Sequence, residues 1–162
     1  MSQARDQVKH RLAAEALRSG LHLHIRASGS SMLPTLWPGD LLTIGSVAVE
    51  QALPGDLILY MREQRFFVHR LVEKRQGDRI LITRGDCLPA ADPPVLAKEV
   101  LGKVVHVQRD AVGFAPSLRL AGVRLLIARL LCYFNPLQQL ALRFHARYRS
   151  AHFDLTLVED AC

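Results

Sequence analysis

Residues 29–36 read GSSMLPTL, and a second turn sequence, Pro38-Gly39-Asp40, follows almost directly. Ser31 therefore stands at the entry to a proline-containing turn, with only small residues immediately before it. A serine nucleophile requires such a position, because a fixed backbone corner with little bulk keeps the hydroxyl accessible and offers N–H groups to an oxyanion. The same composition is also typical of an ordinary surface turn. This stretch alone does not separate the two interpretations.

Two later segments supply the other groups that a serine hydrolase needs. His69 lies in the apolar run VHRLV, and residues 83–92 read TRGDCLPAAD, which contains Asp86 and Asp92. In a serine–histidine–aspartate site, the imidazole takes the proton of the hydroxyl and the carboxylate orients the ring. The structural alternatives are a hydrogen-bonded core histidine and two turn aspartates.

These blocks, in this order, resemble the type I signal peptidase family of serine endopeptidases. The family's G-x-S-M-x-P-T-L block matches residues 29–36, its G-D plus apolar strand matches residues 55–60, and its G-D-N-N-x-x-D-D block is similar to residues 85–92. Most bacterial and organellar members use a lysine base. Archaeal, endoplasmic-reticulum and some sporulating-bacterial members carry a histidine at the position of His69. The resemblance spans roughly residues 25–105, about half of the chain, and three ordered blocks make it specific.

The resemblance implies a role for each matching residue. Ser31 is the nucleophile and His69 the general base, while Asp92, which matches the last aspartate of the family block, is the first choice for the orienting carboxylate. Asp86 is the second choice. The oxyanion hole would combine the Ser31 N–H with a donor from the three preceding residues, which are Ser28, Gly29 and Ser30. Substrate contacts are expected from Met32 and Pro34.

A histidine base changes what the site requires. A lysine must be desolvated before it can act as a base at neutral pH, whereas an imidazole ordinarily titrates near ~6.5. The ring must instead be aimed by a partner, which is why a carboxylate is expected here. This mechanism needs no metal and no cofactor, and we predict neither. His22 and His24 would share a strand face, but the sequence offers no third ligand near them.

The order of the blocks along the chain fits a single catalytic domain with helical ends. Short apolar runs punctuated by turns predict β-strands at residues 22–27, 41–44, 57–61, 66–74, 79–83 and 100–107. We expect an N-terminal helix over residues 1–20, with Leu12 and Leu17 on one side, a catalytic β domain over 21–110, and a helical segment over 111–162. The resemblance implies a mainly β, antiparallel, barrel-like fold, which the self-cleaving repressor family shares.

The positive charge is concentrated in the C-terminal segment. The 162-residue chain has 21 basic and 15 acidic residues, and six arginines but no acidic residue lie between residues 111 and 153. The remaining 15 basic and 15 acidic residues cancel. Because this segment is also strongly apolar, residues 118–149 are interpreted either as a peripheral membrane contact or as two helices packing on the core with snorkelling arginines. No nucleic-acid-binding motif accompanies the arginines, so no nucleic-acid partner is expected.

The sequence predicts neither a membrane span nor a signal peptide. The longest window without charge, residues 130–142, has 13 residues and contains Asn135-Pro136, against the ~20 that a bilayer core requires. Residues 2–19 are too polar for a signal peptide. We therefore expect a cytoplasmic protein, with membrane association left open. Three widely spaced cysteines fit reduced thiols better than a disulfide framework.

The expected function is a serine endopeptidase that removes a leader or signal segment from a peptide or protein precursor. Two alternatives remain. A self-cleaving regulator of the related repressor family would use a lysine base, and the nearest lysine in the sequence is Lys74. A catalytically inactive peptide-binding module would keep the fold without turnover.

Overall fold

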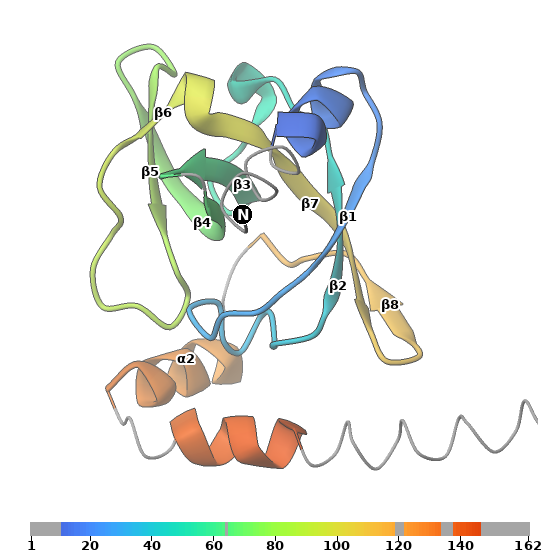
Figure 1. Ribbon diagram of the computed structural model, residues 1–162. Helices are drawn as coiled ribbons and strands as arrows, with labels where there is room; N and C mark the ends of the chain where they lie inside the picture. The colour runs from blue at the N-terminus through green and yellow to red at the C-terminus, as the bar shows by residue number, and fades with distance from the viewer. Residues whose placement is uncertain (1–10, 64, 119–121, 134–137, 147–162) are drawn as a thin grey trace, which may run out of the picture.

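The computed structural model describes residues 11–63, 65–118, 122–133 and 138–146. Its centre is an antiparallel sheet whose strands are β1 (Leu23–Arg26), β2 (Leu41–Gly45), β3 (Leu57–Arg62), β4 (Arg65–Arg75), β5 (Ile80–Arg84), β6 (Val95–Leu96), β7 (Val100–Arg109) and β8 (Val112–Phe114). The path of paired strands runs β1-β2-β7-β3-β4-β5-β6, and β8 pairs with β7 beside it (Figure 1). The mainly β, antiparallel prediction is confirmed. The sheet is not closed, because the path does not return to β1.

Each of the six predicted strand regions overlaps an observed strand. Strands β6 and β8 were not predicted, because they are two and three residues long and too short to show an alternating pattern. Two 3-10 turns, Val49–Gln51 and Ala97–Glu99, were not predicted either. Because β8 pairs with β7, the sheet continues to residue 114, and the predicted domain boundary at residue 110 falls inside a hairpin.

The central strand β3 is buried on both of its faces. Leu57 and Leu59 point into one core cluster, whereas Ile58 and Tyr60 point into another. This follows from the two-residue period of a strand, and it explains why the run LILY is continuously apolar. The first cluster also holds Leu17 of the N-terminal helix, whose described turns cover residues 11–18.

The apolar face predicted for that helix is only partly right. Leu17 is buried as expected, but Leu12 is largely exposed, and Ala14 takes the second buried position. Ala14 and Leu17 are three residues apart and therefore share one side of a helix.

Two Pro-Gly-Asp turns have the same internal structure. Asp40 accepts the Trp37 N–H at 2.8 Å, and Asp56 accepts the Leu53 N–H at 2.9 Å. The glycines adopt φ values of 93° and 103°, which L-residues rarely adopt. Basic side chains of β7 neutralise both carboxylates, since Arg109 pairs with Asp40 and Lys103 with Asp56. The turns therefore fix the starts of β2 and β3 against β7.

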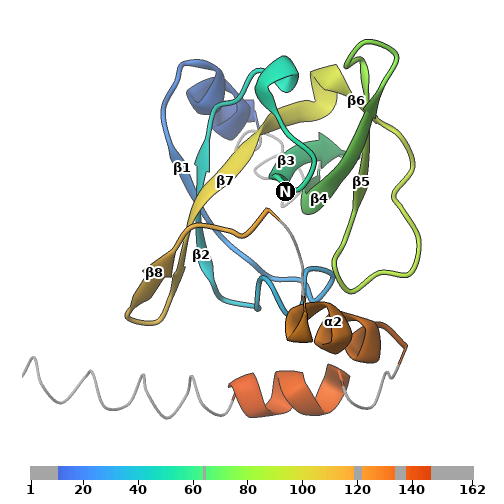
Figure 2. The ribbon, with the colours of Figure 1, turned by 180° about the vertical axis from the view of Figure 1, so that it is seen from behind.

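Two helices lie at one end of the molecule, beneath the loop between β1 and β2 (Figures 1 and 2). They are α2 (Val123–Tyr133) and the helical residues 138–146. Leu131 of α2 is buried against Leu33 and Cys87, with Ala141 and Leu142 packed on the same cluster. Core packing, one of the two interpretations of this segment, is therefore observed. None of the described helices has the length and hydropathy needed to span a bilayer.

We predict that Gly55→Ala strongly destabilises the fold. A Cβ at Gly55 would lie 2.1 Å from the Leu118 carbonyl oxygen, in addition to the cost of the positive φ. The expected loss in free energy of unfolding is about 3–4 kcal/mol, measured by urea titration. Gly20→Ala is the matched control, because Gly20 also has a positive φ but has nothing within 4 Å of its Cβ position. Its expected loss is about 1 kcal/mol, and an equal loss in both variants would contradict the packing argument.

Candidate active site

Three separate segments bring the predicted catalytic residues together. Ser31 lies in the loop between β1 and β2, His69 lies on β4 where it is paired with Ile58 of β3, and Asp92 lies between β5 and β6. The Ser31 Oγ is 2.9 Å from the His69 Nε2, and the His69 Nδ1 is 2.7 Å from the Asp92 Oδ2. The histidine is buried, while the serine is half-buried. The three side chains form one continuous hydrogen-bonded line.

The contact with Asp92 selects one tautomer of the neutral His69 ring. An ionised carboxylate only accepts hydrogen bonds, so the His69 Nδ1 must carry the hydrogen that Asp92 accepts. The neutral ring then leaves Nε2 free to accept the Ser31 hydroxyl proton. This is the arrangement in which an imidazole acts as a general base toward a serine.

Asp92 is held in its ionised form by its neighbours. Burial alone would raise the pKa of this carboxyl, but hydrogen bonds from His69 and Thr83, together with the charge of a protonated His69, lower the pKa below its ordinary value. The Thr83 hydroxyl donates to the Asp92 Oδ2 at 2.7 Å, and the Thr83 carbonyl accepts the Asp92 N–H at 2.8 Å. Thr83 is fully buried in β5, so these two hydrogen bonds attach Asp92 to the core of the sheet.

Tyr60 borders the same site from β3. Its hydroxyl lies 3.4 Å from the His69 Nδ1. Burial and the negative charge of Asp92 raise the pKa of Tyr60 to about 12, so the phenol stays neutral beside the carboxylate. Arg62, two residues later, binds the carbonyls of Pro93 and Pro94 at 3.2 and 2.6 Å. This contact anchors the chain directly after Asp92.

Asp86, the second candidate for the orienting carboxylate, lies elsewhere. Its two oxygens accept from the Arg70 Nε and Nη2 at 2.7 and 2.8 Å, a bidentate pair, and one of them also accepts the Thr35 hydroxyl. Because Arg70 follows His69 on β4, this pair ties the base-bearing strand to the nucleophile loop. The geometry therefore assigns the orienting position to Asp92 and a structural position to Asp86.

Backbone contacts hold Ser31 in place. The Ser31 carbonyl accepts the Cys87 N–H at 2.8 Å, and a Cβ at Gly85 would lie 2.7 Å from that carbonyl oxygen. Gly85 is therefore needed for the close approach of the two loops rather than for its φ. Burial, followed by the nearby Cys132 and Asp86, raises the pKa of the Cys87 thiol, which is the behaviour of a packing residue rather than of a nucleophile.

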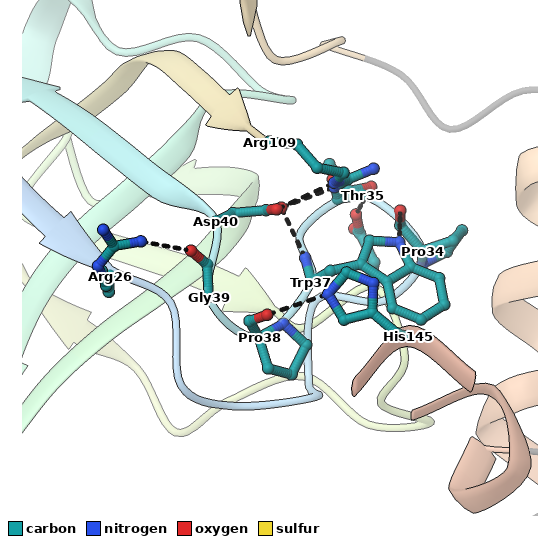
Figure 3. Close-up of polar contacts among 10 residues, drawn as sticks. Arg26, Pro34, Thr35, Trp37, Pro38, Gly39, Asp40, Arg109 and His145 are labelled. Atoms are coloured by element: carbon teal, nitrogen blue, oxygen red, sulfur yellow. Dashed lines mark hydrogen bonds and ion pairs between the residues drawn. The ribbon is translucent and has the colours of Figure 1, made fainter. Parts of the chain in front are cut away.

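The far end of the nucleophile loop has a second ionic clamp (Figure 3). Arg109 of β7 donates to both Asp40 oxygens, at 2.9 and 2.6 Å, and to the Thr35 carbonyl at 3.0 Å. Thr35 is thus held by its side chain toward Asp86 and by its carbonyl toward Arg109. Trp37 closes the turn by donating its indole N–H to the Pro34 carbonyl at 3.1 Å.

A cavity of about 530 Å³ opens beside Ser31 and His69. Residues 25–29 line it on one side and residues 65–69 on another, and the apolar side chains of Met32, Leu36 and Leu42 complete it. Strand β5 begins to pair with β4 only at Arg70, so it does not flank residues 65–69. The cavity is therefore not covered by β5 beside Ser31 and His69.

The other predicted site residues divide into two groups. Ser28, Gly29 and Met32 line the cavity, although Met32 is also buried in the core. Ser30 and Pro34 are not among the lining residues. The Ser30 hydroxyl instead accepts a hydrogen bond of 3.0 Å from Gln138 of the last described helix.

Sequence reasoning missed the residues that support the site. Thr35, Thr83 and Arg109 carry no local signal, because their role depends on contacts with residues up to 74 positions away. Arg70 is adjacent to His69, but adjacency on a strand places the two side chains on opposite faces. Lys74, the only candidate for a lysine base, binds Asp78 and the carbonyls of residues 49 and 50.

Comparisons with known proteins add no assignment. No protein-family model matches this chain, and no curated protein matches it significantly. Within the described ranges, no cluster of three or more histidine, cysteine, aspartate or glutamate residues is arranged to hold a metal ion.

We predict that Asp86→Ala lowers the stability of the fold, because the charge of Arg70 then has no carboxylate partner in a mostly buried position. The Arg70 side chain is 12% exposed and that of Asp86 is 3% exposed. Removing one partner of such a pair leaves an uncompensated charge and should lower the free energy of unfolding by about 3–5 kcal/mol. Glu73→Ala, in the exposed pair with Arg75, should cost less than about 1 kcal/mol. Similar losses in the two variants would show that Asp86 is not a structural clamp.

The stability contributed by Asp92 should depend on pH. Because the folded pKa of Asp92 is lowered, its contribution is complete above the unfolded value of about 3.9 and is lost as the pH falls through the lower folded value. The difference in free energy of unfolding between the wild type and Asp92→Asn should therefore be constant near neutral pH and shrink on acidification. Urea unfolding across a pH series measures this difference. If this difference in free energy of unfolding grows on acidification, the pKa of Asp92 is raised in the folded protein, not lowered.

Proposed function

We propose that this protein is a serine endopeptidase of the type I signal peptidase kind, in the variant that uses a histidine base. The observation that carries the proposal is the unbroken line from the Ser31 Oγ through the His69 ring to the Asp92 carboxylate, with distances of 2.9 and 2.7 Å. Its position beside an apolar cavity adds support, because a peptide can reach the hydroxyl. The finer fold assignment, a barrel-like signal peptidase fold, is part of this proposal.

The chemistry follows from the geometry. The substrate backbone lies in extended form between residues 25–29 and 65–69, as in strand addition to a sheet. The Ser31 Oγ attacks the scissile carbonyl while its proton moves to the His69 Nε2. The Ser31 N–H and a donor from residues 28–30 bind the oxyanion. The protonated imidazole then donates its proton to the leaving amine, and a water molecule hydrolyses the acyl-enzyme by the same steps.

The proposed substrate is a peptide or protein precursor that carries a leader or signal segment. The apolar lining of the cavity, from Met32, Leu36 and Leu42, supports an apolar segment near the cleavage site. The resemblance adds an expectation of small residues, such as alanine, before the scissile bond.

The two alternatives make different demands on the site. Self-cleavage with a lysine base is disfavoured because the Lys74 ammonium binds Asp78 instead of Ser31. A protein that only binds peptides does not need His69 aligned with Ser31, nor an ionised Asp92 beside the His69 ring. Hydrolysis needs both. The aligned site therefore favours turnover.

We predict that the purified protein cleaves peptides in trans and that cleavage depends on the three residues. A peptide library carrying apolar segments followed by small residues is incubated with the protein, and mass spectrometry identifies new termini. Ser31→Ala should abolish cleavage. Asp92→Asn should lower kcat by ~10⁴-fold, because an amide that donates to the His69 Nδ1 leaves the ring proton on Nε2, where the Ser31 proton must be accepted. Ser46→Ala is the matched control, since Ser46 is an exposed serine remote from the cavity lining.

Three outcomes would contradict the proposal. Cleavage that persists in His69→Ala would show that the base is misassigned. Cleavage of the chain itself, without cleavage of any added peptide, would indicate a self-cleaving regulator. Retention of peptides by the wild type and by Ser31→Ala alike, without any new terminus, would indicate a binding module. Circular dichroism spectra of all variants establish that they are folded.

A further inference from the structure

Helix α2 is apolar on two opposite faces. Ala128 and Leu131 face the protein core and are buried. A second stripe, spaced i, i+3, i+4 and i+7, faces away from it and is 38–73% exposed; its members are Val123, Leu126, Ile127 and Leu130, with Tyr133 at its end. Core packing accounts for the first face only, so the exposed stripe requires a separate explanation.

The next helix repeats this division. Ala141 and Leu142 pack on the cluster around Leu33, whereas Leu140 and Phe144 are 51% and 63% exposed. We call the seven exposed side chains the C-terminal apolar surface; they are Val123, Leu126, Ile127, Leu130, Tyr133, Leu140 and Phe144. Isolated exposed leucines are ordinary, but a set concentrated on two neighbouring helices marks a binding surface.

The charge of this segment identifies the partner. Residues 111–153 contain six arginines and no acidic residue, and both described arginines beside the stripe, Arg129 and Arg143, are exposed. Helices that lie in a lipid interface combine an apolar face with basic side chains that reach the anionic headgroups. A flat apolar stripe needs no complementary groove in a bilayer, since acyl chains adapt to its shape.

We propose that the C-terminal apolar surface docks this protein on an anionic membrane, with α2 lying flat in the interface. The two helices sit beneath the nucleophile loop (Figures 1 and 2). Gln138 donates to the Ser30 hydroxyl at 3.0 Å, and the His145 Nε2 lies 3.1 Å from the Pro38 carbonyl oxygen. The His145 ring also contacts that of Trp37 in a tilted arrangement, with 4.8 Å between the ring centroids. Docking would therefore hold the nucleophile loop at the lipid surface.

Vesicle sedimentation of the full chain tests this proposal without any use of catalysis. We expect the protein to sediment with vesicles that contain phosphatidylglycerol and to stay in solution with pure phosphatidylcholine vesicles. Leu126→Glu with Leu130→Glu should abolish sedimentation, because two carboxylates enter the apolar stripe. Leu53→Glu with Val112→Glu is the matched control, since these side chains are 57% and 65% exposed but belong to other parts of the protein.

The arginines provide an independent arm. Arg129→Gln and Arg143→Gln should each weaken partitioning about fivefold, whereas Arg79→Gln, in an exposed turn before β5, should not change it. Binding that is unchanged in Leu126→Glu/Leu130→Glu, or equal on both lipid compositions, would overturn the proposal. A wild type that is dimeric in sedimentation velocity, monomeric after the leucine substitutions and unbound to vesicles would assign the surface to a second copy of the chain. Ser31→Ala should bind vesicles normally, so failure of the peptidase proposal would remain distinguishable.

Discussion

The arrangement of the site depends on one half-buried negative charge. His69 and Thr83 both donate to the Asp92 Oδ2, and these hydrogen bonds favour the ionised carboxylate against the cost of its burial. That charge determines which ring nitrogen of His69 is protonated, and hence whether the other nitrogen can accept the Ser31 proton. Two further contacts support Asp92. The phenol of Tyr60 stays neutral beside it, and Arg62 anchors the chain directly after it by binding the carbonyls of Pro93 and Pro94. Several otherwise unrelated contacts are therefore explained by the need to hold one carboxylate beside one imidazole.

A separate set of ion pairs positions the loop that carries Ser31. Two ion pairs hold Thr35. The pair of Arg70 and Asp86 contacts its side chain, and Arg109, which pairs with Asp40, contacts its carbonyl oxygen. The loop that carries Ser31 is therefore fixed to both β4 and β7. The catalytic contacts need not supply that rigidity themselves. This division explains why the chain has two aspartates in the segment after β5. Asp92 contacts the His69 ring, and Asp86 joins Arg70 of β4 to Thr35 in the loop that carries Ser31.

The C-terminal helices connect this site with the outside of the molecule. One face of α2 completes the small cluster of Leu33, Cys87 and Leu131, and the opposite face remains apolar and exposed. The same helical pair reaches the nucleophile loop through Gln138 and His145. The sequence of this segment allowed either core packing or membrane contact. Because a helix has more than one face, one face of α2 packs on the core while another stays exposed for the proposed membrane contact.

The sequence by itself determined the approximate strand positions, because apolar alternation and turn residues are local properties. Ser31, His69 and Asp92 became candidates through the ordered blocks that resemble a known peptidase family. The sequence also located the Pro-Gly-Asp turns, because the hydrogen bond that defines each turn joins residues only three positions apart. Only the tertiary structure decided between Asp92 and Asp86, revealed the support from Thr83, Thr35 and Arg109, and left the sheet open. These features depend on contacts between segments far apart in the chain, and no local pattern records which distant partner a side chain will meet.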